Sequence, residues 1–342
     1  MDLKPALASR YDRRAFLKAL SAGSAASLGG WSPSLLAAEP PPETNSLRLA
    51  QVPGICFAPQ YVAEELLRGE GFSDIRYLRL PGGATVPASM GKGEIDLAIR
   101  YVASSVLDID TGLPLVMLAG IHPGCFELFG SSRVQTVRDL KGRVVSIPRE
   151  GSTQHVFLAA VAAQVGLNPK RDIRWEENPL AEQLQRLAEE KVDAIMTFPP
   201  VAQEARAKKV GRVIVNSAID KPWSQYFCCC ITANRDFVRR HPVAAKRAVR
   251  ALLKAADLCV TGPETTARFL VERGYTERYD YALQALKEIP YRHWRTYSGE
   301  DSVRFWALRL HETGFIKSSP NRILAEGTDW RFLNELKKEL RA

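Results

Sequence analysis

The chain has 342 residues, of which 46% are hydrophobic, 25% are charged and 8% are aromatic. These proportions are typical of a globular protein and exclude disordered, collagen-like and coiled-coil chains. The net charge is +9, but the basic residues are scattered, which argues against a nucleic-acid-binding surface. Six cysteines are too few for a disulfide scaffold, and no uninterrupted apolar run reaches transmembrane length. The length favours about two domains.

Residues 1–40 have the composition and order of an export signal. Arg13 and Arg14 precede a Phe-Leu-Lys sequence, and a mildly apolar run of small residues follows at 19–28. A charged, then apolar, then small-residue order predicts export, and the arginine pair resembles the twin-arginine type of signal. The alternative is an ordinary amphipathic first helix. We therefore expect the rest of the chain to work in the periplasm.

After this segment, short apolar strands alternate with helices. The predicted strands are 47–52, 75–80, 95–99, 113–121, 143–147, 173–176, 192–196, 213–215 and 227–231. Helices are predicted after Pro59, after a Thr85 cap, after a Ser152 or Thr153 cap, and at 180–190. From residue 234 the pattern is helical to the end, and the strand–helix order before it predicts parallel α/β units. The segments 93–99 and 190–196 resemble each other, which suggests two similar lobes.

Ligands of open α/β sheets bind beyond the carboxyl ends of the strands. The segments at these ends combine glycines, hydroxyls, aromatic rings and a few charges, and two lead into capped helices whose free N–H groups favour an anion. The predicted ligand-binding residues are Gly54, Phe57, Gly82, Gly83, Ala84, Thr85, Arg100, Tyr101, Ser104, His122, Glu150, Ser152, Thr153, His155, Phe198 and Tyr226. For any one segment an ordinary turn and cap is the alternative, and Arg100 and Glu150 could instead form a cross-cleft salt bridge.

Several segments together resemble the sulfonate, nitrate and taurine class of periplasmic binding proteins. These segments are 57–65, 91–99, 139–145, 234–237 and 241–242, in the order that the class shows. The resemblance implies a two-lobed type II α/β fold with two hinge crossovers and a helical C-terminal region. It places residues 45–130 and 222–342 in one lobe and 131–221 in the other. It also implies a monomeric receptor that closes over a small anionic or heteroaromatic solute and delivers it to a membrane ABC permease.

The same class has relatives that synthesise the thiamine pyrimidine. In those synthases a lysine carries pyridoxal phosphate, a histidine follows one turn later, and a cysteine-rich run is implicated in iron. The matching positions here are Arg100 and Ser104, and a protonated arginine cannot form a Schiff base. We therefore expect neither an enzyme nor a cofactor. The alternatives are a synthase-like enzyme using iron and pyridoxal phosphate, and a partner that presents its ligand to a membrane sensor.

Three consecutive cysteines, Cys228, Cys229 and Cys230, lie on the last predicted strand. Alternation along a strand puts Cys228 and Cys230 on one side and Cys229 on the other, so the three cannot bind one metal ion without distortion. Buried packing is the favoured interpretation, because free cysteine packs like a small hydrophobic residue. A disulfide and a metal or ligand contact are the alternatives. Cys56 and Cys125 also lie near strand ends, but the sequence does not pair them.

Overall fold

The structure is a computed structural model that describes residues 39–340 except Pro53 and 81–84. Arg13, Arg14 and the rest of the predicted export signal lie outside these residues, apart from its last two positions. Residues 41–342 form one unit by their internal contacts. Within the described part of the chain, no helix combines the length and apolar character needed to span a membrane.

The first sheet has five strands in the order β2-β1-β3-β10-β4. Their bounds are β1 (Ser46–Ala50), β2 (Asp74–Leu78), β3 (Leu97–Tyr101), β4 (Leu115–Pro123) and β10 (Phe227–Asn234). β1 is parallel to β2 and β3, whereas β10 is antiparallel to both β3 and β4. All residues of β4 and β10 are buried, as expected for strands covered on both faces.

The second sheet repeats this plan in the order β7-β6-β8-β5-β9. Its strands are β5 (Glu127–Gly130), β6 (Val144–Ile147), β7 (Arg174–Glu177), β8 (Ala194–Thr197) and β9 (Arg212–Asn216). β6 is parallel to β7 and β8, and β5 is antiparallel to β8 and β9. The prediction of parallel units therefore holds within each lobe but is wrong for β10, and β5 was not among the predicted strands. Both strands are antiparallel to their neighbours, because each enters its sheet from the other lobe.

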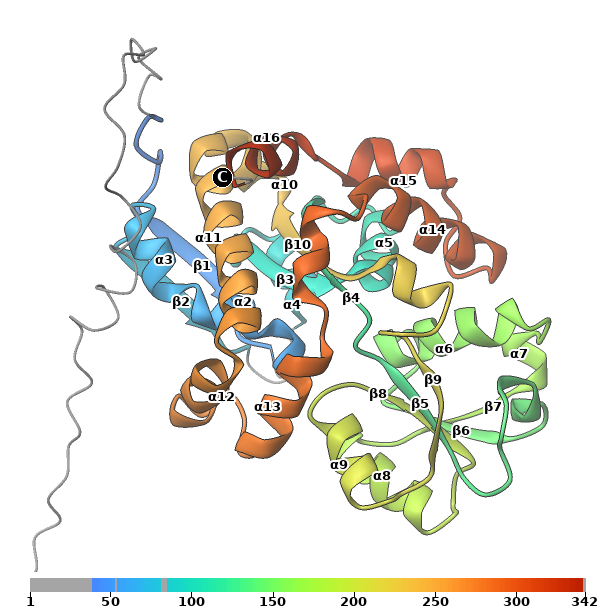
Figure 1. Ribbon diagram of the computed structural model, residues 1–342. Helices are drawn as coiled ribbons and strands as arrows, with labels where there is room; N and C mark the ends of the chain where they lie inside the picture. Colours follow the sequence, from blue (N-terminus) through green and yellow to red (C-terminus); the bar gives the residue numbers. More distant parts are fainter. Residues whose placement is uncertain (1–38, 53, 81–84, 341–342) are drawn as a thin grey trace, which may run out of the picture. The chain divides into compact units, whose positions relative to one another are not determined.

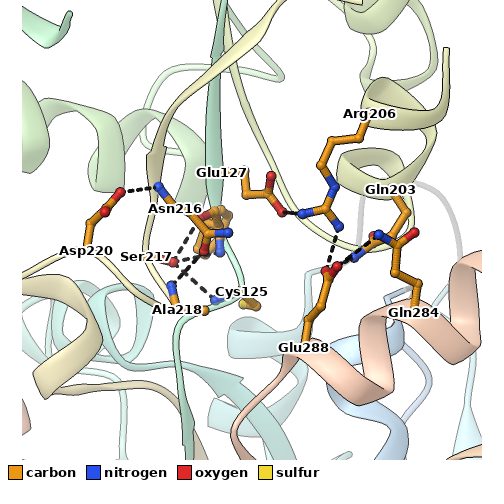
Figure 2. Close-up of polar contacts among 11 residues, drawn as sticks. Cys125, Glu127, Gln203, Arg206, Asn216, Ser217, Ala218, Asp220, Gln284 and Glu288 are labelled. Carbon is orange, nitrogen blue, oxygen red and sulfur yellow. Dashed lines mark hydrogen bonds and ion pairs between the residues drawn. The ribbon is translucent and has the colours of Figure 1, made fainter. Parts of the chain in front are cut away.

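The chain passes between the sheets twice, at segments that we call the first crossover (124–126) and the second crossover (217–226). The first joins β4 to β5, and the second returns from β9 through η3 (Trp223–Gln225) to β10 (Figure 1). Ser217 ties them together, because its hydroxyl accepts from the backbone N–H groups of Cys125 and Phe126 at 3.1 and 2.9 Å (Figure 2). The fold is thus the predicted two-lobed α/β type with two hinge crossovers. β5 pairs within the second sheet, although the expected boundary after residue 130 assigned it to the first lobe.

Helices cover both sheets. In the first lobe they are α2 (Ala58–Val62), α3 (Glu64–Gly69), α4 (Val86–Gly91) and α5 (Val102–Asp110), with η1 (Ile55–Phe57). In the second lobe they are α6 (Thr153–Gln164), α7 (Pro169–Asp172), α8 (Leu180–Ala188) and α9 (Val201–Ala207), with η2 (Val137–Leu140). Thr85 caps α4 and Ser152 caps α6, as predicted, and α6 is buried along most of its length.

The C-terminal region is helical, as predicted, and packs on the first lobe. Its elements are α10 (Arg235–Arg240), α11 (Pro242–Thr261), α12 (Pro263–Glu272), α13 (Tyr279–Glu288), η4 (Tyr291–Arg295), α14 (Gly299–Glu312), α15 (Pro320–Gly327) and α16 (Arg331–Glu339). The long helix α11 lies along α2 and α3, and α14 and α15 contact α5 (Figure 1). The indole N–H of Trp306 on α14 donates to the carbonyl of Phe227, which fixes the start of β10.

Gly124 lets the two crossovers approach each other. Its φ is +51°, and a Cβ there would lie 2.2 Å from the Cα of Ala218. We expect Gly124→Ala to lower the free energy of unfolding by about 2 kcal/mol through overpacking, beyond the left-handed backbone cost. The matched control is Gly93→Ala, because Gly93 has φ +72° and nothing within 4 Å of such a Cβ. Urea unfolding measures both, and equal losses would show that the crossovers can separate without cost.

Candidate functional site

A pocket of about 400 Å³ lies between the lobes. We call it the cleft pocket. Its first-lobe residues are Val52, Phe57, Thr85, Val86, Pro87, Ile99, Arg100, Tyr101, Ser104, Leu107 and Asp108, and its second-lobe residues are Arg149, Gly151, Ser152, Thr153 and Phe198. Apart from Leu107 and Asp108 on α5, these residues lie at or after the carboxyl ends of β1, β2, β3, β6 and β8, where an α/β sheet presents its loops to a ligand.

Aromatic rings from both lobes form one side of the cleft pocket. The centroid of Tyr101 lies 5.3 Å from that of Phe57 and 5.9 Å from that of Phe198. Beneath them, the ring of Phe126 in the first crossover lies 4.8 Å from Tyr101 and 5.7 Å from Phe198. Edge and tilted contacts of this kind hold rings in fixed orientations, so this side offers a preformed apolar surface.

Arg100 supplies a cation at the end of β3. Its side chain is nearly buried, and its Nη2 donates to the Asp108 carboxylate at 2.5 Å. The other terminal nitrogen, Nη1, is buried and has no hydrogen-bond partner among the described residues. A buried guanidinium N–H without an acceptor is costly, so a ligand or water that accepts from it is strongly favoured.

The start of α6 faces the pocket from the second lobe. In the part of the chain that the structure describes, the backbone N–H groups of Thr153 and Gln154 have no acceptor. Arg149, which lines the pocket nearby, is exposed and forms no ion pair with a described carboxylate. Free N–H groups at a helix N-terminus and an adjacent guanidinium favour a negatively charged ligand group.

Among the described residues, one side-chain hydrogen bond joins the two lobes across the cleft pocket. Ser104 Oγ on α5 lies 2.7 Å from Thr153 Oγ1 on α6. The bond exists only while the lobes are in contact, so it contributes to the free energy of the closed form.

We expect Ser104→Ala to weaken solute binding about fivefold, because one hydrogen bond contributes roughly 1 kcal/mol. The matched control is Ser105→Ala, since Ser105 Oγ bonds to Thr232 Oγ1 at 3.1 Å within the first lobe. Calorimetric titration of the solute measures both variants. An equal loss of affinity in the two would contradict a cross-lobe role for Ser104.

The structure brings half of the predicted ligand-binding residues to the cleft pocket: Phe57, Thr85, Arg100, Tyr101, Ser104, Ser152, Thr153 and Phe198. Gly54 lies next to it, since a Cβ at this position would lie 3.2 Å from Phe57 and 3.3 Å from Phe198. Gly82, Gly83 and Ala84 fall outside the described residues. The predicted set did not include Arg149 and Gly151, which lie on either side of the predicted Glu150. It also did not include Val52, Val86, Pro87, Ile99, Leu107 and Asp108.

Four predicted residues lie away from the pocket. His122 is fully buried, with its ring nitrogens 3.1 and 3.2 Å from the carbonyl oxygens of Pro123 and Cys56. His155 packs on Trp175, and its Nδ1 accepts the backbone N–H of Gly151. Burial lowers the pKa of His155, so its neutral form is favoured.

The other two predicted residues that lie away from the pocket are Tyr226 and Glu150. Tyr226 stacks on Phe305 with ring centroids 4.0 Å apart. Glu150 is exposed, and its backbone N–H donates to the Glu177 carboxylate. Arg100 and Glu150 therefore do not form the cross-cleft salt bridge that the sequence left open, because Arg100 pairs with Asp108 of its own lobe.

A second cross-lobe contact lies at the hinge, and we call it the hinge network. Arg206 on α9 donates to Glu127 at 2.9 Å and to Glu288 on α13 at 2.5 Å, and Gln203 also donates to Glu288 (Figure 2). Glu127 is 5% exposed, and its Oε2 has no partner among the described residues. Burial raises the pKa of Glu127 to about 7, with Arg206 opposing and Glu288 adding to the shift.

Four buried cysteines meet beside the hinge, and we call them the thiol cluster: Cys56, Cys125, Cys228 and Cys229. The predicted alternation is wrong here, because a bulge at the start of β10 turns both Cys228 and Cys229 toward Cys125. Cys230 lies apart from the cluster, 3.3 Å from Thr232 Oγ1.

The thiols of the cluster perturb one another. Burial opposes ionisation of Cys56 and Cys228, but neighbouring thiols and His122 bring the pKa of Cys56 well below its usual range and that of Cys228 to about 5. Burial raises the pKa of Cys125 and that of Cys229 well above the usual range of a cysteine thiol.

Comparison with solved structures shows the fold. The nitrate-binding protein NrtA of Synechocystis PCC 6803 aligns with a TM-score of 0.74 at 16% identity, covering 88% of this chain and 90% of that chain. The alkanesulfonate-binding protein SsuA of Xanthomonas axonopodis pv. citri, bound to MOPS, aligns with a TM-score of 0.64 at 17% identity, covering 81% of this chain and 96% of that chain. A Candida albicans gene product with the generic periplasmic binding protein fold aligns with a TM-score of 0.67 at 14% identity, covering 83% of this chain and 96% of that chain.

Sequence comparison assigns the family. No curated protein matched the sequence. The profile of the NMT1-like family matches residues 40–272, which include both sheets and both crossovers. The chain therefore belongs to the NMT1-like family.

Proposed function

We propose that this chain is a solute-binding receptor that closes its two lobes over a small organic anion with an apolar or aromatic body. The observation that carries this proposal is the cleft pocket itself, where Arg100 Nη1 has no partner among the described residues and Phe57, Tyr101 and Phe198 line the same pocket. The guanidinium and the start of α6 would bind the anionic group, and the rings would pack against the rest. Closure by hinge motion at the crossovers follows from the two-lobed fold.

The structural neighbours support this class of ligand. One is named as a nitrate-binding protein and another as an alkanesulfonate-binding protein bound to MOPS, so both names refer to anions. A pocket of about 400 Å³ with three aromatic side chains suits an organic sulfonate or carboxylate better than nitrate alone.

The proposal also includes the export, the cellular location and the membrane partner of the receptor. Residues 1–40 would be a twin-arginine-type export signal, and the mature monomer would deliver its solute to an ABC permease from the periplasm. Its lobes would have the expected bounds of 45–130 with 222–342 and of 131–221, except that β5 belongs with the second sheet. A ligand-presenting sensor partner would use the same pocket and differ only in the membrane protein that it contacts.

A synthase-like enzyme is the competing function. It would need an amine to hold pyridoxal phosphate where Arg100 stands, and that guanidinium is instead paired with Asp108. Ser104, at the matched histidine position, bonds to Thr153. Neither side chain offers the nucleophile or base that the synthase reaction requires.

Calorimetric titration of the mature protein tests the proposal. We expect benzenesulfonate and an alkanesulfonate to bind more tightly than nitrate, and benzamidine, an aromatic cation, not to bind. Native mass spectrometry of protein isolated from the periplasm should show a non-covalent anionic adduct that is lost on denaturation. Tighter binding of the cation, or a covalent pyridoxal adduct, would contradict the receptor proposal.

A further inference from the structure

The thiol cluster gathers sulfur ligands from three separate segments. Cys56 belongs to η1, Cys125 to the first crossover and Cys229 to β10. Their Sγ atoms all lie within 4.8 Å of one another, and none of the three side chains is more than 6% exposed. Sulfur ligands lie about 2.3 Å from a bound metal ion and hence about 4 Å from each other, so small side-chain rotations would complete the geometry.

The number and chemical type of the ligands in the thiol cluster indicate which metal ion it would bind. Cys228 lies 3.3 Å from Cys125 but is not part of the group whose sulfur atoms are all mutually close, so four thiolates do not surround one point. His122 is not free to add a nitrogen ligand, because both of its ring nitrogens lie against carbonyl oxygens. Zinc requires four tetrahedral ligands in a structural site, whereas soft thiolates without oxygen ligands suit copper(I).

We propose that Cys56, Cys125 and Cys229 form a buried three-thiolate site for copper(I). Each cysteine binds as a thiolate, so binding releases thiol protons to solvent and changes no oxidation state. The ion would join η1, the first crossover and the start of β10, which are segments that meet at the hinge. The site is separate from the cleft pocket, because none of its three cysteines lines that pocket.

Anaerobic loading of the reduced protein with copper(I) tests this site. We expect one copper per chain by elemental analysis, retained against the competing chelator bicinchoninate, with a higher thermal unfolding midpoint. Cys125→Ser and Cys229→Ser should each weaken copper binding at least tenfold. The matched controls Cys230→Ser and Cys259→Ser replace buried cysteines outside the cluster and should keep the copper.

A second measurement does not depend on the variants folding. Bound copper should protect Cys56, Cys125 and Cys229 of the wild-type protein from alkylation in denaturant-titrated mass spectrometry. The proposal is overturned if copper is absent, if all four variants lose it alike, or if zinc or iron displaces it at equal concentration. It is also overturned if the isolated protein carries a Cys125–Cys228 disulfide and reduction of that bond does not restore copper binding.

Discussion

Replacing Arg100 with methionine is expected to weaken the binding of an organic anion about a hundredfold. Truncating one member of a buried charge pair costs about 3 kcal/mol, which corresponds to about two factors of ten in affinity. Two effects add up at this position. The variant removes the buried Nη1, which has no partner in the part of the chain that the structure describes, and it leaves the Asp108 carboxylate facing the pocket without its cation.

The matched control for this prediction is Asp108→Asn. It removes the carboxylate but leaves Arg100 in place, so anion affinity should stay the same or rise. Calorimetric titration with benzenesulfonate measures both variants, and circular dichroism checks that each is folded. If Arg100→Met binds the anion as tightly as the wild-type protein, the anion does not contact this part of the cleft pocket. If Asp108→Asn is the weaker binder, Arg100 depends on Asp108 for its position.

The pocket could be anticipated from local signals in the sequence. A strand followed by a turn and a Ser or Thr cap marks the carboxyl end of a strand, which is how Thr85, Ser152 and Thr153 were identified. Asp108 was missed because it lies two turns along α5, far from any strand end. Its contact with Arg100 depends on how α5 packs on the sheet, which no local pattern shows.

The thiol cluster shows where local patterns fail. Alternation along a regular strand separates Cys228 from Cys229, but the bulge adds a residue against β4 and brings both toward Cys125. His122 was predicted in the cleft because it follows an apolar strand. The strand instead continues to Pro123 and carries the ring into the core, since β4 extends into the first crossover.

The hinge network makes stability depend on pH through Glu127. Its pKa is raised from 4.5 to about 7 in the folded protein. The folded state therefore binds more protons than the unfolded state between these values, and the free energy of unfolding falls as pH rises through this window. Between pH 4.5 and 7 the free energy of unfolding should fall by about 3 kcal/mol, and above pH 7 this contribution should no longer change. Glu127→Gln cannot titrate and should abolish this part of the slope.

Urea unfolding at pH 5 and pH 8 measures the slope. Glutamine keeps an oxygen that can accept from Arg206, so Glu127→Gln should be more stable than the wild-type protein at pH 8 and similar at pH 5. The matched control is Glu288→Gln, which removes the other carboxylate on Arg206 and should leave a smaller slope of the same sign, because the repulsion that helps raise the pKa of Glu127 is gone. An unchanged slope in Glu127→Gln would show that this carboxyl group does not hold its proton. Because Arg206 joins the lobes, deprotonation changes the charge of the hinge network from zero to minus one, and closure should share the same pH dependence.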